Sequence, residues 1–459
     1  MSLSIIILAA GKGSRMKSSK PKVIHTVAGK PMLQHVIETS QSLNPDQILV
    51  VVGHGSEQVT DKIRGSNIIF VEQAEQLGTG HAVMQCHAQL TPGNDILVLY
   101  GDVPLIRKET LQPLIRQDDD NTVVSLLSFK PQNPSGYGRI IRDNVGDVVA
   151  IVEEKDANDE IRRIRESNSG ILYIKGGEYQ ALLAELDNNN AQQEYYLTDV
   201  VKHAVAARHR VYAVICADEQ EVMGVNNQQQ LAEVERIHRS RKASQLMENG
   251  VKLVDPTRID IRGHINAGED VEIDVNCVFE GDVELGDQVR IGPNCVIKNC
   301  RIGSGTEIHA MSIIEESDIG EQNSIGPFAR IRPQTTTMKQ ARIGNFVEIK
   351  KSKIGIGSKV NHLTYIGDTE MGADVNIGAG TITCNYDGAF KHQTIIEDDV
   401  FVGSDTQLVA PVRVCKGTTI GAGSTITRDT PPGQLTFSRA KQVSISGWQR
   451  PRKNKPEGK

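Results

Sequence analysis

The sequence lacks an excess of positive charge, a disulfide pattern and a long apolar segment. Its net charge is −6, with both signs mixed along the chain, whereas a face that binds nucleic acid is basic. We therefore expect no nucleic-acid partner. Seven cysteines occur without a CxxC pair, which argues against a disulfide framework. The first apolar run, residues 3–10, is too short for a signal peptide or a membrane span, so we expect a soluble, cytoplasmic protein.

The residue pattern changes near residue 250, and the 459 residues suffice for two or three domains. Before that point, short apolar runs such as 48–52 and 96–99 alternate with helical segments such as 32–42. This alternation predicts an open, mostly parallel α/β sheet, doubly wound and Rossmann-like, which binds ligands at the carboxyl ends of its strands. We predict a first domain over residues 1–227, a charged linker helix over 228–249 and a second domain over 250–459.

From residue 273 onward, aliphatic side chains recur every six residues. Ile273, Phe279 and Leu285 begin the series, and occasional five-residue steps, as from Ile297 to Ile302, group the repeats in threes. Groups of three predict a parallel β-solenoid with three-sided coils, whose aliphatic side chains point into the core. A sandwich of short antiparallel strands would need hairpin turns and a two-residue alternation, and neither is prominent.

A glycine-rich segment follows the first apolar run. Gly11 and Gly13 would let backbone N–H groups approach a phosphate, and Arg15 and Lys22 would add positive charge. The spacing fits neither a dinucleotide fingerprint nor a P-loop. Asp102 follows another predicted strand, where its carboxylate is suited to Mg²⁺. The alternative for this aspartate is a capping role.

These motifs resemble those of the sugar-1-phosphate nucleotidyltransferases. The match runs in order through residues 8–16, 73–82, 99–104, 136–139, 151–153, 168–170 and 224–227. Residues 73–82 are most similar to the N-acetylglucosamine-1-phosphate uridyltransferases. The resemblance implies that UTP reacts with N-acetylglucosamine 1-phosphate, with Arg15 and Lys22 as catalytic residues and Mg²⁺ held by Asp102 and Asn226. It implies that the nucleotide and sugar contacts are Leu8, Ala9, Ala10, Gly11, Lys22, Gln73, Gly78, Thr79, Tyr100, Gly101, Asp102, Gly138, Glu153, Asn168 and Asn226.

In a three-sided solenoid, residues one coil apart in sequence become neighbours in space. Arg332 and Lys350 each follow an inward aliphatic residue and are 18 residues apart, so we expect stacked cations about 4.8 Å apart along one edge. Such a pair would bind an anion, for example a sugar phosphate; the alternative is two solvated surface cations. Glu348 and Tyr365 stack likewise, and His362, which leaves the core at a coil edge, is suited to act as a base near neutral pH.

The six-residue period is interrupted between Thr383 and Ile396, so residues 384–391 must leave the coil as a loop, and such loops commonly lie on the binding face. Residues 345–351, 361–368 and 376–388 resemble the hexapeptide-repeat acetyltransferases, whose coils are left-handed. With the first domain included, the resemblance covers nearly the whole chain. It points to the family of bifunctional enzymes that join an N-acetylglucosamine-1-phosphate uridyltransferase to a glucosamine-1-phosphate acetyltransferase.

This second resemblance implies a homotrimer that uses acetyl-CoA, with His362 as base and Glu348 in support. The implied sugar-phosphate contacts are Arg332, Lys350, Tyr365, Asn376 and Lys391. The implied acetyl-CoA contacts are Ala379, Asn385, Tyr386, Ser404, Ala422 and Arg439. The alternative is a uridyltransferase alone, with the solenoid as a trimerising scaffold that would need neither stacked cations nor a histidine. The basic tail after Ser438 is expected either to meet CoA phosphates or to be a solvated end.

Overall fold

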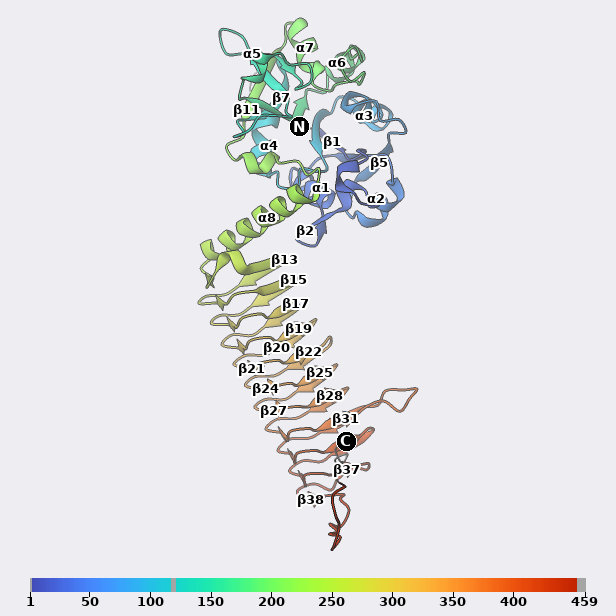
Figure 1. The fold of residues 1–459 in the computed structure, drawn as a ribbon, viewed down its shortest axis with the longest axis vertical. Helices are drawn as coiled ribbons and strands as arrows, with labels where there is room; N and C mark the ends of the chain where they lie inside the picture. The colour runs from blue at the N-terminus through green and yellow to red at the C-terminus, as the bar shows by residue number, and fades with distance from the viewer. Residues whose placement is uncertain (1, 117–120, 452–459) are drawn as a thin grey trace, which may run out of the picture. The chain divides into compact units, whose positions relative to one another are not determined.

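The computed structural model describes residues 2–116 and 121–451. The chain divides into two compact units, Met1–Lys242 and Ala243–Lys459 (Figure 1). The division falls inside helix α8 (Gln228–Glu248), whose Val234 and Ile237 pack in the core of the first unit. In the part of the chain that the structure describes, no helix is long and apolar enough to cross a bilayer.

The first unit is built on a twisted, mostly parallel sheet with strand order β11-β7-β10-β6-β1-β4-β5. Strands β1, β4, β5 and β6 are parallel, and β10 is antiparallel to both of its neighbours. The predicted architecture is confirmed. The strands are β1 (Leu3–Leu8), β4 (Gln47–Val52), β5 (Ile68–Glu72), β6 (Asp95–Tyr100), β7 (Thr122–Phe129), β10 (Ser167–Ile174) and β11 (Arg210–Ile215), with a side hairpin of β8 (Arg139–Arg142) and β9 (Val148–Val152) and a small pair, β2 (Thr26–Val27) and β3 (Lys30–Pro31).

Helices cover both faces of this sheet because alternate residues of its strands point to opposite sides. Ile6 of β1 belongs to one apolar cluster, whereas Ile5 and Ile7 belong to another. All three side chains are fully buried. The helices are α1 (Met32–Ser42), α2 (Ser56–Lys62), α3 (Thr79–Met84), α4 (Lys108–Ile115), α5 (Asp159–Arg162), α6 (Tyr179–Ala184) and α7 (Asp199–Ala206).

The second unit is a parallel β-solenoid, as predicted from the six-residue period. Every residue of the predicted inward series, from Ile273 to Ile426, is at most 4% exposed. The strands form long parallel ladders in which residues one coil apart are paired, such as Ile308 with Ile325 and Ile325 with Ile343. Stacked coils therefore pack aliphatic side chains directly on one another along the core.

Each coil contributes short strands to three ladders. The first contains β12 (Lys252–Leu253), β14 (Glu272–Ile273), β16 (Arg290–Ile291), β18 (Glu307–Ile308), β21 (Ser324–Ile325), β24 (Arg342–Asn345), β27 (Lys359–His362), β30 (Asn376–Ile377), β33 (Phe401–Val402), β36 (Thr419–Ile420) and β38 (Leu435–Thr436). The second contains β19 (Ile313–Glu315), β22 (Arg330–Ile331), β25 (Glu348–Lys350), β28 (Tyr365–Gly367), β31 (Ile382–Cys384), β34 (Gln407–Val409) and β37 (Thr425–Ile426). The third contains β20 (Asp318–Ile319), β23 (Thr336–Thr337), β26 (Lys353–Ile354), β29 (Thr369–Met371), β32 (Thr394–Ile396) and β35 (Val412–Val414); at the start of the solenoid β13 (Ile259–Ala267), β15 (Cys277–Leu285) and β17 (Val296–Ile302) join these two ladders.

One corner of the solenoid carries exposed apolar side chains, which we call the corner ridge: Met311, Phe328, Phe346 and Leu363. All four have a positive φ, between 48° and 61°, a conformation that is unusual for bulky residues. The rings of Phe328 and Phe346 stack with centroids 5.2 Å apart. A continuous apolar strip therefore runs along the corner over several coils.

Candidate functional sites

Four polar side chains converge where β1 and β6 end, in the first unit. Lys22 Nζ lies 2.5 Å from Asp102 Oδ2 and 3.2 Å from Asn226 Oδ1. Arg15 donates to the same Asn226 oxygen at 2.9 Å. The backbone N–H of Val225 donates to the carbonyl oxygen of Asp102 at 3.0 Å. This bond brings two segments that are distant in sequence to one edge of the sheet.

The glycine-rich loop after β1 is shaped to admit Lys22. Gly13 has a left-handed φ of 58°, and a Cβ there would lie 2.7 Å from the Cβ of Lys22. Only glycine permits this approach without displacing the lysine. The N–H of Gly101 donates to the carbonyl of Leu8 at 3.0 Å, so the ends of β1 and β6 are fixed side by side. The glycine-rich loop and the segment that carries Asp102 therefore meet at the carboxyl ends of β1 and β6, as predicted.

A cavity of about 230 Å³ opens beside this cluster. The lining residues that we predicted are Leu8, Ala9, Ala10, Gly11, Lys22, Gln73, Gly78, Thr79, Tyr100 and Asp102. The cavity also includes Val23, Gln76, Ala82 and Glu194, to which the sequence reasoning gave no role. Gln76 lies within the 73–82 motif, so the motif could have identified it as a cavity residue. Glu194 lies outside any motif and arrives through the backbone bond from Tyr195 to Leu77, at 2.8 Å.

Three further predicted residues form a second group that does not line this cavity. The N–H of Asn168 donates to the carbonyl of Gly138 at 2.8 Å, and a Cβ on Gly138 would lie 3.4 Å from the carboxyl group of Glu153. Thr198 donates its hydroxyl to Glu153 at 3.1 Å. Burial raises the pKa of Glu153, and the Thr198 bond opposes this rise. The N–H of Gly170 donates to Asn168 Oδ1 at 3.1 Å, and a Cβ on Gly170 would lie 2.6 Å from the Tyr100 ring, so this group lies beside the cavity wall. Burial also raises the pKa of Tyr100, with a further contribution from Glu153.

The oxygens of Asp102 and Asn226 fit a magnesium ion. Both are hard donors, and both face a single point, which the ammonium group of Lys22 occupies. Mg²⁺ is commonly bound through one or two protein oxygens, with substrate phosphates and water completing its shell. Within residues 2–116 and 121–451, no group of three or more His, Cys, Asp or Glu side chains could hold a metal.

A second cluster of cations lies on the solenoid. Ile331 pairs with Ile349, so Arg332 and Lys350 follow on adjacent coils, as expected. Lys391 lowers the pKa of Lys350 most strongly, and partial desolvation and the charge of Arg332 add to this effect. Neighbouring cations repel one another, and an anion between them relieves that repulsion.

The loop after β31 carries Lys391 to this place. The chain leaves the solenoid there as an extended excursion (Figure 1), closed by an antiparallel bridge between Tyr386 and Lys391. The Asn385 amide donates to Asp368 Oδ2 at 2.6 Å. Asp387 accepts from the N–H groups of Phe390 and Ala389 and pairs with His392 Nε2 at 2.6 Å. These contacts fix the loop at its base and at its tip.

Glu348 and Tyr365 stack on adjacent coils, as predicted. The contact that was not predicted is the pairing of Glu348 with Arg332, whose guanidinium donates to its carboxylate at 2.8 Å. Tyr365 folds over Gly367, where a Cβ would lie 2.4 Å from the Tyr365 hydroxyl. Glu348 therefore belongs to the cation cluster, where it offsets part of the charge of Arg332.

His362 ends strand β27 and is exposed. Its Nδ1 lies 2.9 Å from Oδ1 of Asn345, its neighbour on the preceding coil. An amide oxygen only accepts, so Nδ1 carries the proton and Nε2 of the neutral ring has a free lone pair. Asn345 lies within the 345–351 motif, but the motif does not by itself assign it a role. No hydrogen bond between His362 and Glu348 is found among the residues that the structure describes.

Three of the six residues implied for acetyl-CoA lie in one column next to His362. The N–H of Gly380 donates to the carbonyl of His362, which sets Ala379 beside it. Ser404 and Ala422 follow on the next coils, since Val402 pairs with Ile377 and with Ile420. The implied residues that lie in this column are Ala379, Ser404 and Ala422.

The other implied residues are more scattered. The Arg439 guanidinium lies over the Phe437 ring at 5.5 Å and close to Gly421, at the end of the column. Asn385 is buried against Asp368, and Tyr386 is exposed on the loop. Asn376 pairs with Lys359 on the first ladder, not the second, so one chain does not bring it to the cations. Of the basic tail, residues 452–459 lie outside the described residues.

Comparisons with known proteins agree with the division of the chain into two units. Residues 5–169 match the MobA-like NTP transferase domain. Residues 261–337 match the GMPPB C-terminal domain, and residues 393–428 match the bacterial transferase hexapeptide (six repeats).

Similar proteins extend over almost the entire chain. The bifunctional protein GlmU of Azoarcus sp. (strain BH72) is 56% identical over 99% of this chain and 100% of its own length. Those of Ralstonia pickettii (strain 12J) and Nitrosomonas eutropha (strain DSM 101675 / C91 / Nm57) are 53% and 54% identical, each over 99% of this chain and 100% of their own length. At this identity and coverage, the chain belongs to the GlmU family of bifunctional proteins.

Proposed function

We propose that the chain is a bifunctional transferase that makes UDP-N-acetylglucosamine. The solenoid transfers an acetyl group from acetyl-CoA to glucosamine 1-phosphate. The first unit then transfers a uridylyl group from UTP to N-acetylglucosamine 1-phosphate and releases pyrophosphate. The observation that carries this proposal is that one chain contains two cation clusters, each suited to a phosphorylated substrate: Arg15 with Lys22, and Arg332 with Lys350 and Lys391.

In uridylyl transfer, a phosphate oxygen of the sugar attacks the α-phosphorus of UTP, and the bond to pyrophosphate breaks. No protein nucleophile is needed, because positioning and charge neutralisation supply the catalysis. Arg15 and Lys22 would offset charge on the phosphates. Bound Mg²⁺ would neutralise further phosphate charge, and Asp102 and Asn226 would hold it after Lys22 moves from between them.

Different residues of the first site would bind the two substrates. Gln73 and the Gly78–Thr79 segment line the cavity and would recognise the uracil of UTP. Gly138, Glu153 and Asn168 form the separate group beside Tyr100 and would hold the N-acetylglucosamine through its hydroxyl and amide groups. Glu153 is already bonded by Thr198 at 3.1 Å, so it is oriented before the sugar arrives.

In acetyl transfer, the 2-amine of glucosamine 1-phosphate attacks the thioester carbonyl of acetyl-CoA. A C–N bond forms, the C–S bond breaks and CoA leaves as its thiol. His362 would take the proton from the amine through Nε2, because Nδ1 is bound to Asn345. The cations Arg332, Lys350 and Lys391 would hold the phosphate, and Tyr365 would close the sugar site. The column from Ala379 to Ala422, with Tyr386 and Arg439, would hold the CoA.

We also propose that the active form is a homotrimer. The corner ridge exposes apolar side chains to water, and burying them would be favourable. We propose that a second copy of this chain buries them, because the ridge includes Leu363, which directly follows the proposed base His362. Asn376 lies on a different ladder from Lys350, so it would complete the site of a neighbouring copy. All seven cysteines are free thiols, which is in keeping with a reducing cytoplasm.

Two variants measured in two assays test the whole proposal. With acetyl-CoA, glucosamine 1-phosphate, UTP and Mg²⁺, free thiol reports acetyl transfer and pyrophosphate reports uridylyl transfer. Asp102→Ala should abolish pyrophosphate release and leave thiol release unchanged, and His362→Ala should slow thiol release by roughly 100-fold or more. With N-acetylglucosamine 1-phosphate supplied, His362→Ala should release pyrophosphate normally. The scaffold alternative requires that no thiol be released by the unsubstituted protein.

A further inference from the structure

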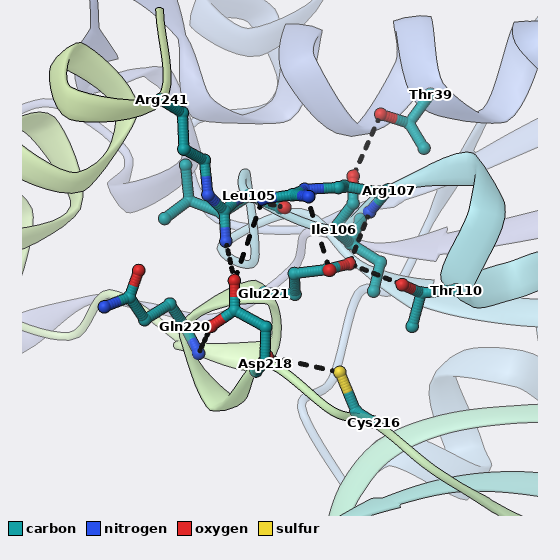
Figure 2. A network of polar contacts seen from close by, with 10 residues as sticks. All are labelled: Thr39, Leu105, Ile106, Arg107, Thr110, Cys216, Asp218, Gln220, Glu221 and Arg241. Carbon is teal, nitrogen blue, oxygen red and sulfur yellow. Dashed lines mark hydrogen bonds and ion pairs between the residues drawn. The ribbon is translucent and has the colours of Figure 1, made fainter. Parts of the chain in front are cut away.

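A polar network joins the chain after β6 to the segment before α8 (Figure 2). Glu221 lies at its centre and is 5% exposed. Its Oε2 accepts the N–H of Arg107 at 3.2 Å and the hydroxyl of Thr110 at 2.7 Å. A buried carboxylate is costly unless it is hydrogen-bonded, so these bonds fix the Glu221 segment against the start of α4.

Arg241 of α8 joins the same two segments. One guanidinium nitrogen donates to the carbonyl oxygen of Leu105 at 3.0 Å, and another donates to Oδ2 of Asp218 at 2.8 Å. The planar guanidinium satisfies both acceptors at once through two different nitrogens, whereas a lysine would have to reach both acceptors from one nitrogen. Asp218 in turn accepts the N–H of Gln220 at 3.0 Å. Figure 2 shows Arg241 reaching both segments from one side.

The joined segments contain both proposed metal donors. Asp102 lies three residues before Leu105, and Asn226 lies a few residues after Glu221. The direct backbone link between the segments near these donors is the 3.0 Å bond from Val225 to Asp102. Neither Glu221 nor Arg241 lines the cavity, so any effect they have on the reaction passes through the residues they hold.

We propose that Arg241 is a positioning residue for uridylyl transfer. It holds residues 102–105 against residues 218–226, so that the side-chain oxygens of Asp102 and Asn226 face one point. The proposal rests on the function proposed above for the first unit. Residues that orient metal ligands are worth roughly 10- to 100-fold in metal affinity or activity, so Arg241→Ala should weaken Mg²⁺ binding about tenfold.

The test compares three variants of the full chain. Arg241→Ala removes both donating nitrogens, and Arg241→Lys keeps the charge but loses the planar fork. Arg236→Ala is the matched control, because Arg236 lies on the same helix and pairs with Glu233 on an exposed surface. The measurements are the Mg²⁺ dependence of pyrophosphate release, Mn²⁺ binding in the presence of UTP by electron paramagnetic resonance, and hydrogen exchange of the peptide containing Val225.

We expect Arg241→Ala to raise the Mg²⁺ and Mn²⁺ constants about tenfold and to speed exchange at Val225. High Mg²⁺ should restore most of the rate, and the KM for N-acetylglucosamine 1-phosphate should change little. Arg241→Lys should lie between this variant and the unsubstituted protein. Arg236→Ala, and acetyl transfer in every variant, should be unchanged.

Unchanged Mn²⁺ binding and unchanged exchange in Arg241→Ala would overturn the positioning role, whatever happens to the rate. Equal effects of Arg236→Ala would overturn it as well, because they would reflect general weakening of α8. If Arg241→Ala does not fold, Arg241→Lys gives the same comparison. If the unsubstituted protein makes no UDP-N-acetylglucosamine, the proposed function fails separately, while Mn²⁺ binding and exchange still decide the role of Arg241.

Discussion

Asn345 holds the imidazole of His362 from the preceding coil, with its Oδ1 2.9 Å from Nδ1. This contact selects the tautomer whose Nε2 can accept a proton. It also fixes the ring at the corner of the solenoid, beside Leu363 of the corner ridge. The proposed base and the residue that orients it are therefore 17 residues apart in sequence but adjacent in space.

We expect Asn345→Ala to lower kcat for acetyl transfer by about 10- to 100-fold, part of the roughly 10²- to 10⁴-fold that a general base contributes. The ring would lose its fixed orientation, while the KM for glucosamine 1-phosphate should change little. Thiol release measured between pH 6 and 9 checks this. The Asn345→Ala/His362→Ala double variant should be no slower than His362→Ala alone. Independent, additive losses would refute the coupling.

The repulsion between Lys350 and Lys391 predicts a specific pH dependence. The pKa of Lys350 lies below its usual value because of Lys391 first, then partial desolvation and Arg332. Lys350 therefore loses its proton at a lower pH than an ordinary lysine, and phosphate binding weakens as the pH rises through that lowered pKa.

In Lys391→Met, the KM for glucosamine 1-phosphate should rise roughly tenfold at pH 7.5, the loss of one charged hydrogen bond. Its alkaline increase in KM should move to higher pH, because the pKa of Lys350 recovers. KM measured from pH 7 to 10 tests both parts. Lys339→Met is the control, since Lys339 pairs with Glu321 on the exposed surface. If the KM of Lys391→Met rises at the same alkaline pH as that of the unsubstituted protein, this explanation is contradicted.

The corner ridge predicts the effect of a charge on assembly. Phe346→Asp replaces a ring that stacks on Phe328 with a carboxylate. If a second copy packs against the ridge, this carboxylate would be buried, and burying an unpaired charge is costly. Sedimentation should show a trimer for the unsubstituted protein and a monomer for Phe346→Asp, with acetyl transfer lost and uridylyl transfer kept. Val145→Asp, an exposed site in the first unit, is the control. A trimer that persists in Phe346→Asp would exclude the ridge as the interface.

Acid should destabilise the first unit through His238. Burial, together with His35 and nearby cations, lowers the pKa of His238 to about 3 in the folded state, whereas the unfolded chain has a pKa near 6.5. Below about pH 6.5 the unfolded state binds a proton that the folded state does not, so stability falls as the pH falls, by up to about 2 kcal/mol at pH 5.

Urea unfolding of the full chain at pH 7.5 and pH 5 measures this loss. His238→Gln removes the titrating group, so the difference between the two pH values should shrink. His87→Gln serves as the control, because His87 is exposed. If His238→Gln and His87→Gln lose the same stability between the two pH values, the acid sensitivity has another source.

Local patterns predicted much of the fold. The bounds of α1, Met32–Ser42, match the predicted helix, and the inward solenoid residues are buried throughout. In both cases the signal is a short period that one element imposes on its own residues. The same counting placed Arg332 beside Lys350, because one coil has a nearly constant number of residues.

Contacts between distant segments escaped prediction. Glu194 reaches the cavity wall, Arg332 pairs with Glu348, and Lys391 approaches Lys350 only because its loop is fixed by Asn385 and Asp387. No periodicity places Glu194 or Lys391, since each depends on how a loop returns to the fold. Arg332 and Glu348 do lie on adjacent coils, but spacing alone does not say that their side chains pair.

Local sequence patterns were enough to predict the two architectures, the place of the glycine-rich loop and the stacking of residues one coil apart. These follow from repeating local geometry and from the alternation of apolar side chains. Only the folded structure showed that Lys22 lies between Asp102 and Asn226, and that Arg241 joins the segments holding those two oxygens. Such contacts form where loops from separate strand ends meet, so their partners are set by packing and not by spacing along the chain.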